Sequence, residues 1–255
     1  MTIEILLLSI TMAIAAGLVG SFAVMRRMGL AADPMSHVAL PGIGIALALH
    51  INPLCGAVAM LLFGALLVWA VEGKARLGTE AIIGVLFSVA LALGSMMTSG
   101  EELIDALFGG TGALKWPEIC FGLIASSAVI AFVVTQRNRL VAMLVSPDVA
   151  RTAGIDVRRL DLLYLETFAL TIALGLRFLG VLLMGALIII PAATAKRLAR
   201  NLTEMLVLAV SIAVAATLAG TWLASFFHRQ TGPFIVIVAA ACFLLSFNRL
   251  FLRHG

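Results

Sequence analysis

Long apolar stretches alternate with short polar breaks along almost the whole chain. An apolar helix needs about 20 residues to cross a bilayer, and about 17 is the practical minimum. Because each of the stretches reaches this minimum, we predict nine membrane-spanning helices joined by short loops. The predicted spans are residues 5–25, 34–50, 54–71, 81–98, 119–135, 160–176, 178–195, 205–227 and 232–248.

Two neighbouring stretches allow a second interpretation. Residues 160–176 contain Glu166, and only Arg177 separates this stretch from residues 178–195. Either stretch can be a broken or re-entrant helix, because a charged side chain is costly in the centre of a membrane. The pattern is therefore compatible with either eight or nine membrane crossings.

Composition supports a single membrane domain over residues 1–255. Only 12% of the residues are charged and 62% are hydrophobic, whereas a soluble domain is about 25% charged. The apolar run that begins at Glu4 has no Lys or Arg before it, so we expect an uncleaved first span. The cysteines are scattered through apolar runs, which argues against a disulfide or zinc framework. The expected fold class is an all-α, polytopic bundle in the lipid bilayer.

The positive charges indicate how the bundle is oriented. If the N-terminus lies outside and nine spans follow, only Lys115, Arg177 and Arg229 of the 17 Lys and Arg residues fall in outer loops. Cytoplasmic loops of membrane proteins carry such an excess of positive charge. We therefore predict the N-terminus outside and the C-terminus inside. The net charge of +4 then reflects topology, and no nucleic-acid partner is expected.

The longest predicted inner connection, residues 136–159, contains the sequence SPDVARTAG. Ser146 is a suitable N-cap, Pro147 suits the first helical position, and Asp148 favours the positive end of a helix dipole. Gly154 can end the helix. The pattern predicts a short cytoplasmic helix over 146–154, which either docks into a partner protein or is an interfacial loop helix without a partner.

An acid and an imidazole stand together at the start of the second predicted span. Asp33 and His37 are four residues apart, so on a helix they share one face, and both side chains are good ligands for divalent first-row metals. The alternative is structural: Asp33 as an N-cap and Pro34 at the first helical position. Pro41-Gly42 should kink or break the span, because proline removes a helix hydrogen bond.

Several motifs give the chain a resemblance to one transporter family. SPDVARTAGI, followed by GVLLMGALIIIPAATAKRLAR, resembles the permease subunit of the zinc/manganese ABC importers. SHVALPG, TEAIIGVLFS and ALFGG follow the pattern of that family in the same order. These motifs occupy residues 36–42, 79–88, 106–110, 146–155 and 180–200. The likeness extends over about the whole chain, with departures at Ala32, Pro34 and Gly110.

The resemblance implies a fold similar to the vitamin B12 and siderophore permeases and a homodimer in the bacterial inner membrane. It also implies two copies of a separate cytoplasmic ATPase and an outer solute-binding protein that delivers a transition-metal ion. By resemblance, Asp33 and His37 belong to the metal path, and 146–154 is the coupling helix that contacts the ATPase. The residues that match this coupling helix are Ser146, Pro147, Asp148, Ala150 and Gly154.

The absence of nucleotide-binding and hydrolase motifs argues against an enzyme. The sequence has no GxxxxGK[ST] phosphate loop, no HExxH and no GxSxG, so an enzyme activity of the chain itself is not expected. The predicted function is import of Zn²⁺ or Mn²⁺, with Fe²⁺ as a third candidate, driven by ATP bound to a partner subunit and without a permanently bound cofactor. The alternatives are a stand-alone ion-coupled carrier or channel, and a siderophore or vitamin permease.

Overall fold

The computed structural model describes residues 3–74, 77–97, 116–179, 181–227 and 229–251. Every regular element in these ranges is a helix, as the apolar pattern predicts. The ALFGG motif and Lys115 lie outside the described residues. The helices are α1 (Ile3–Met25), α2 (Ala32–His37), α3 (Ala39–Ala48), α4 (Pro53–Glu72), α5 (Thr79–Met97), α7 (Trp116–Val145), α8 (Pro147–Thr152), α9 (Val157–Leu179), α10 (Val181–Leu198), α11 (Leu202–Phe227) and α12 (Thr231–Phe251).

The helices coincide with the predicted spans. Among the described residues, α1, α4, α5, α7 and α11 are long and apolar enough to cross a membrane by length and composition. The stretch 34–50 is shared by α2 and α3, while α9, α10 and α12 cover the remaining three stretches. The chain is therefore a multi-pass helical membrane protein. Crossing by all nine units remains a prediction.

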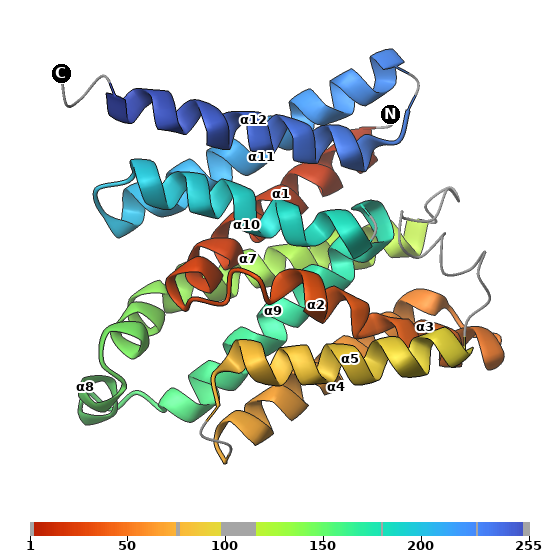
Figure 1. Cartoon of the computed structure of the whole chain (residues 1–255), viewed down its shortest axis with the longest axis horizontal. Coiled ribbons are helices and arrows are strands. Elements are labelled where there is room, and N and C mark those ends of the chain that lie inside the picture. Colours follow the sequence, from red (N-terminus) through yellow and green to blue (C-terminus); the bar gives the residue numbers. More distant parts are fainter. Residues whose placement is uncertain (1–2, 75–76, 98–115, 180, 228, 252–255) are drawn as a thin grey trace.

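Helix α1 forms the centre of the bundle and packs against α7, α10 and α11. Its Phe22 is fully buried and meets the ring of Tyr164 on α9 edge-on, with 6.5 Å between the ring centroids. The Tyr164 hydroxyl donates a hydrogen bond to the Val19 carbonyl oxygen over 3.1 Å. Figure 1 shows the start of α1 and the end of α12 toward opposite ends of the long axis, with α8 on the side of the α12 end.

Helix α7 extends ten residues beyond the predicted span 119–135, into the segment 136–159 that is predicted as the inner connection. The helix continues to Val145. After the polar residues around Arg139, Leu140 and Met143 are again buried, and this spacing keeps an apolar face toward the core. The predicted inner connection thus contains the end of α7 and the short helix α8.

Helices α3 and α4 touch through their backbones. A Cβ atom at Gly42 would lie 2.2 Å from the carbonyl oxygen of Gly56, and one at Gly56 would lie 2.1 Å from that of Gly42. Close approach through small residues is a common way for helices to associate in lipid. This contact holds α3, and with it the end of α2, firmly against α4.

Candidate metal site

The predicted ligand pair lies on the short helix α2. Figure 1 shows α2 near the middle of the long axis, between the end that carries α8 and the end where α1 begins. It contacts α10, α5 and α9, and Ala32, Met35 and Ser36 are buried by these neighbours. One face of α2 is therefore packed into the bundle, while Asp33 is exposed and His37 is partly exposed.

The predicted break in the second span is present, but it lies at Val38 and not at Pro41-Gly42. Pro41 falls in the first turn of α3, where a missing N–H leaves no helical hydrogen bond unmade. A helix running through Val38 would bring the Pro41 ring against the carbonyl of His37, four residues earlier. The break therefore falls before the proline and directly after His37.

The ring of His37 has three contacts, one of which is the Ser36 hydroxyl oxygen at 3.5 Å from Nδ1. The His37 Nδ1 lies 3.0 Å from the carbonyl oxygen of Asp33, and because a carbonyl only accepts, this contact favours the tautomer in which Nδ1 carries the hydrogen. The ring also meets Phe87 of α5 edge-on, with 5.2 Å between centroids. In neutral His37 the Nε2 lone pair is then available to a metal ion.

Asp33 is exposed in the second position of α2. The alternative that it caps the helix was wrong, because the N-cap is Ala31 and no side chain caps this end. Among the described residues, no hydrogen-bond donor or cation pairs with the Asp33 carboxylate. Together with His37 it offers one oxygen and one nitrogen ligand, and no group of three or more His, Cys, Asp or Glu side chains gathers in the described part of the chain.

The nearby basic residue Arg26 is engaged elsewhere. It forms an ion pair with Asp161 of α9, and its guanidinium lies 5.0 Å from the centroid of the Tyr164 ring. The side chains of Arg26 and Asp161 are only 11% and 19% exposed. Arg26 therefore ties the end of α1 to α9 and does not form an ion pair with Asp33.

The predicted inner helix is present as α8. Ser146 has extended backbone angles, and its side-chain oxygen accepts a hydrogen bond from the Val149 N–H over 3.4 Å. Pro147 is the first helical residue. Gly154 adopts a φ of +79°, a conformation that glycine tolerates best, and the Ile155 N–H donates to the Ala150 carbonyl. Both ends of α8 are thus capped as the sequence predicts.

The residues of α8 face in two directions. Ala150 is fully buried, whereas Val149 is 65% exposed and Asp148 and Arg151 form an ion pair on the surface. Ala150 therefore seats the helix on the rest of the chain. Val149, like Pro147, is an apolar side chain that α8 presents outward, and Val149 is not among the coupling residues predicted from the sequence.

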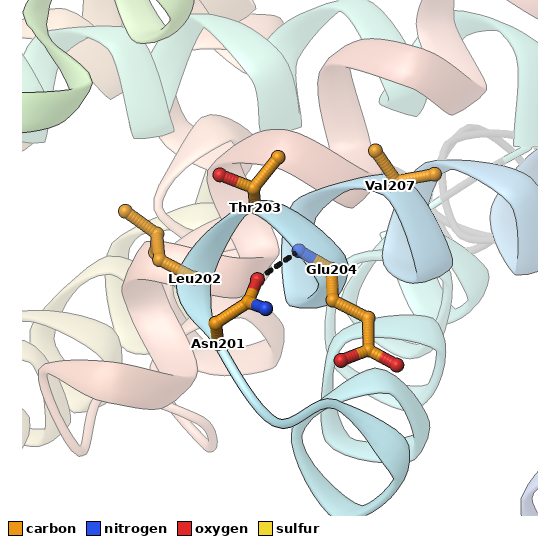
Figure 2. A pocket seen from close by; sticks show the side chains of 5 residues that line it. All are labelled: Asn201, Leu202, Thr203, Glu204 and Val207. Carbon is orange, nitrogen blue, oxygen red and sulfur yellow. Dashed lines mark hydrogen bonds between the residues drawn. The ribbon is translucent and has the colours of Figure 1, made fainter.

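A surface hollow at the start of α11 offers no comparable chemistry. It is lined by Asn201, Leu202, Thr203, Glu204 and Val207. Figure 2 shows the Asn201 side chain turned toward the Glu204 backbone, whose N–H it accepts over 2.8 Å. The Glu204 carboxylate in turn accepts the Arg200 N–H over 2.8 Å. These hydrogen bonds cap the N-terminal end of α11.

Two contacts of the ligand pair were not foreseen. Phe87 lies within the TEAIIGVLFS motif, and its ring contacts the His37 ring. Gly185 of α10 lies against the backbone of Asp33. Both come from helices far along the chain, and sequence spacing carries no signal for such contacts. Glu166 is half-buried in α9 and makes no hydrogen bond or ion pair among the described residues.

The fold defines a multi-pass helical membrane protein, and the Asp33–His37 pair on α2 is its candidate metal site. Residues 1–249 match the ABC 3 transport family. The chain therefore belongs to that family.

Similar proteins agree with this assignment. The high-affinity zinc uptake system membrane protein ZnuB of Haemophilus influenzae is 30% identical over 247 residues, which cover 94% of each chain. The manganese transport system membrane protein MntC of Listeria monocytogenes is 30% identical over 246 residues, covering 95% of this chain and 88% of the relative. These matches confirm the resemblance that the sequence motifs indicate.

A solved structure shows the same fold. A chain of PsaBC from Streptococcus pneumoniae in complex with Fab superposes with a TM-score of 0.82 at 28% identity. The match covers 95% of this chain and 89% of that chain. The prediction of an all-helical ABC permease fold is confirmed.

Proposed function

We propose that this chain is the permease subunit of an ABC importer that carries a divalent transition-metal ion, Zn²⁺ or Mn²⁺, into the cytoplasm. The observation that carries this proposal is the His37 ring, whose Nδ1 contacts the Asp33 carbonyl oxygen and leaves Nε2 for a metal ion. The exposed Asp33 carboxylate lies on the same short helix. The pair belongs to a chain whose relatives are named for zinc and manganese transport.

A site with few ligands suits transport. Divalent first-row ions take four to six ligands in most protein sites, so two side chains from one copy hold the ion weakly. Water and the same pair from a second copy of the chain complete the shell in the proposed homodimer. Weak binding lets the site release the ion once the path to the cytoplasm opens.

The energy comes from a partner in this proposal. An ATPase dimer docks on the cytoplasmic side at α8, with Val149 entering its surface. The capping residues Ser146, Pro147, Asp148 and Gly154 keep α8 helical, and Ala150 seats it. An outer solute-binding protein delivers the ion, and the transporter resides in the bacterial inner membrane.

The choice between the two metals does not follow from the ligand types. Imidazole suits Zn²⁺ and carboxylate suits Mn²⁺, and the pair contains one of each. The relatives are named for zinc, manganese and, in one case, probable iron transport. We therefore propose Zn²⁺ or Mn²⁺ as the substrate, with Fe²⁺ as a third candidate.

The test is the metal content of cells that lack this chain. Zn, Mn and Fe are measured by elemental mass spectrometry after growth at limiting metal. The deletion strain is complemented with wild type, with Asp33→Asn/His37→Ala, or with Val149→Asp. We expect wild type to restore one metal and neither variant to do so, although both reach the membrane.

Each other outcome has a definite meaning. If the ligand variant restores the metal fully, Asp33 and His37 are not part of the path. If the α8 variant restores it fully, the proposed docking of an ATPase at Val149 is wrong. If deletion changes none of the three metals, the substrate is not a transition-metal ion.

A further inference from the structure

Helix α10 approaches the ligand pair at a glycine. Gly185 is buried in α10, and a Cβ atom placed on it would lie 3.1 Å from the backbone nitrogen of Asp33 and 3.2 Å from both Cα and Cβ of Asp33. We propose that Gly185 is a positioning residue for the metal site, because it sets how closely α10 approaches Asp33. This inference rests on the proposed function.

The proximity explains why a glycine stands in this helix. Glycine is less favourable than alanine inside a helix, and α10 is otherwise built largely from Ala, Leu and Ile at this end. Carbon atoms in ordinary contact are about 3.5–4.0 Å apart. A methyl group at Gly185 would therefore push Asp33 away by a few tenths of an ångström.

The displacement would reach both proposed ligands. The Cβ atom of Asp33, which carries the carboxylate, is one of the crowded atoms. The His37 ring is hydrogen-bonded to the Asp33 carbonyl, so a shift of this peptide also turns the imidazole. No side-chain cap holds the start of α2, so the helix depends on its neighbours for its position.

A small shift should change which metal is favoured, not only how much is carried. Zn²⁺ prefers short bonds in a tetrahedral shell, whereas Mn²⁺ accepts larger, oxygen-rich shells. Mutation of residues that position metal ligands typically lowers metal affinity about 10- to 100-fold. We expect Gly185→Ala to lower uptake of the preferred metal about tenfold and to change the ratio of Zn to Mn uptake.

The chain offers a matched control. A Cβ atom at Gly17 of α1 would lie 3.0 Å from backbone atoms of Ala209 and Val210 on α11. Gly17→Ala therefore introduces the same methyl group, with similar crowding against backbone, at a helix contact that does not involve Asp33 or His37. It measures the cost of disturbing the bundle in general.

The experiment measures initial uptake of Zn²⁺ and Mn²⁺, separately and in competition, in cells lacking the wild-type chain. Wild type, Gly185→Ala, Gly17→Ala and Asp33→Asn are compared at equal amounts of chain in the membrane. The expected result is an altered Zn:Mn ratio for Gly185→Ala and the wild-type ratio for Gly17→Ala. Asp33→Asn should lose uptake of both metals.

The outcomes separate this inference from the proposed function. If Asp33→Asn abolishes uptake but Gly185→Ala keeps the wild-type ratio, the proposed function stands and the role of Gly185 is wrong. The role is also wrong if Gly185→Ala is missing from the membrane while Gly17→Ala is present, since Gly185 then serves the fold. If wild type carries neither metal, the proposed function itself fails.

Discussion

The six-residue helices α2, which carries the candidate metal ligands, and α8, the predicted coupling helix, are stabilised in different ways. Helix α8 has a side-chain cap at Ser146, a proline at its first position and a left-handed glycine after its end. Helix α2 has the buried Ala31 as its N-cap, in a helical conformation and without a side-chain hydrogen bond. The same length of helix is thus held by local chemistry in one case and by surrounding helices in the other.

The difference follows from where the two helices lie. An isolated helix of two turns is unstable in water, so α8, at the end of the bundle, needs its caps. Helix α2 is surrounded by α5, α9 and α10, and packing supplies its stability. A helix held by its neighbours moves when they move, which suits a site that must bind and release an ion.

The largest effect should come from the outward face of α8. Val149→Asp places a charge where the proposed ATPase contact excludes water, and burying an unpaired charge in an interface costs several kcal/mol. We expect affinity for the ATPase subunit to fall on the order of a hundredfold. Co-purification and titration of the two subunits in detergent would measure this loss.

A matched variant shows whether the position or the charge matters. Asn138→Asp adds the same negative charge at an exposed position of α7 near the inner end and should leave the affinity unchanged. Equal losses in both variants would mean that general electrostatics, and not docking at Val149, governs the association.

The second effect concerns the ion pair that precedes α2. Arg26→Met removes the cation and leaves the half-buried Asp161 carboxylate without its partner. Breaking a buried pair costs about 3–5 kcal/mol, and because water reaches this one, we expect about 2 kcal/mol. The midpoint of thermal unfolding in detergent should fall accordingly.

A double variant tests the cause of that loss. Arg26→Met/Asp161→Leu removes both charges and should recover most of the stability, since no unpaired charge remains. If the double variant is as unstable as Arg26→Met, the contact of Arg26 with the Tyr164 ring, and not the ion pair, holds this junction.

The two short helices also differ in how well the sequence predicts them. The caps of α8 are neighbours in the chain, so Ser146, Pro147 and Gly154 reveal the helix without any knowledge of the fold. The surroundings of α2 come from distant helices: Phe87 from α5 and Gly185 from α10. The spacing of Asp33 and His37 predicts a ligand pair and Pro41 predicts a break in the span, but the supporting contacts appear only in the packed bundle.

A smaller effect should come from exchanging the caps of the two helices. Ser146→Ala removes a side-chain cap, which costs about 1 kcal/mol of local helix stability, and hydrogen exchange in α8 should accelerate about fivefold. Ala31→Ser should bring no gain, because Ala31 has helical and not extended backbone angles and its side chain is buried. If Ala31→Ser slows hydrogen exchange in α2, then the lack of a side-chain cap also limits the stability of α2.

The smallest effect should come from the surface ion pair of α8, which has the same chemistry as the Arg26–Asp161 pair but a different environment. Asp148 and Arg151 are 90% and 64% exposed, and exposed pairs contribute about 0–1 kcal/mol. Asp148→Asn should therefore change the unfolding midpoint very little and the affinity for the ATPase by less than about twofold. A tenfold loss of affinity at unchanged stability would show that Asp148 contacts the partner directly and does more than support the first turn of α8.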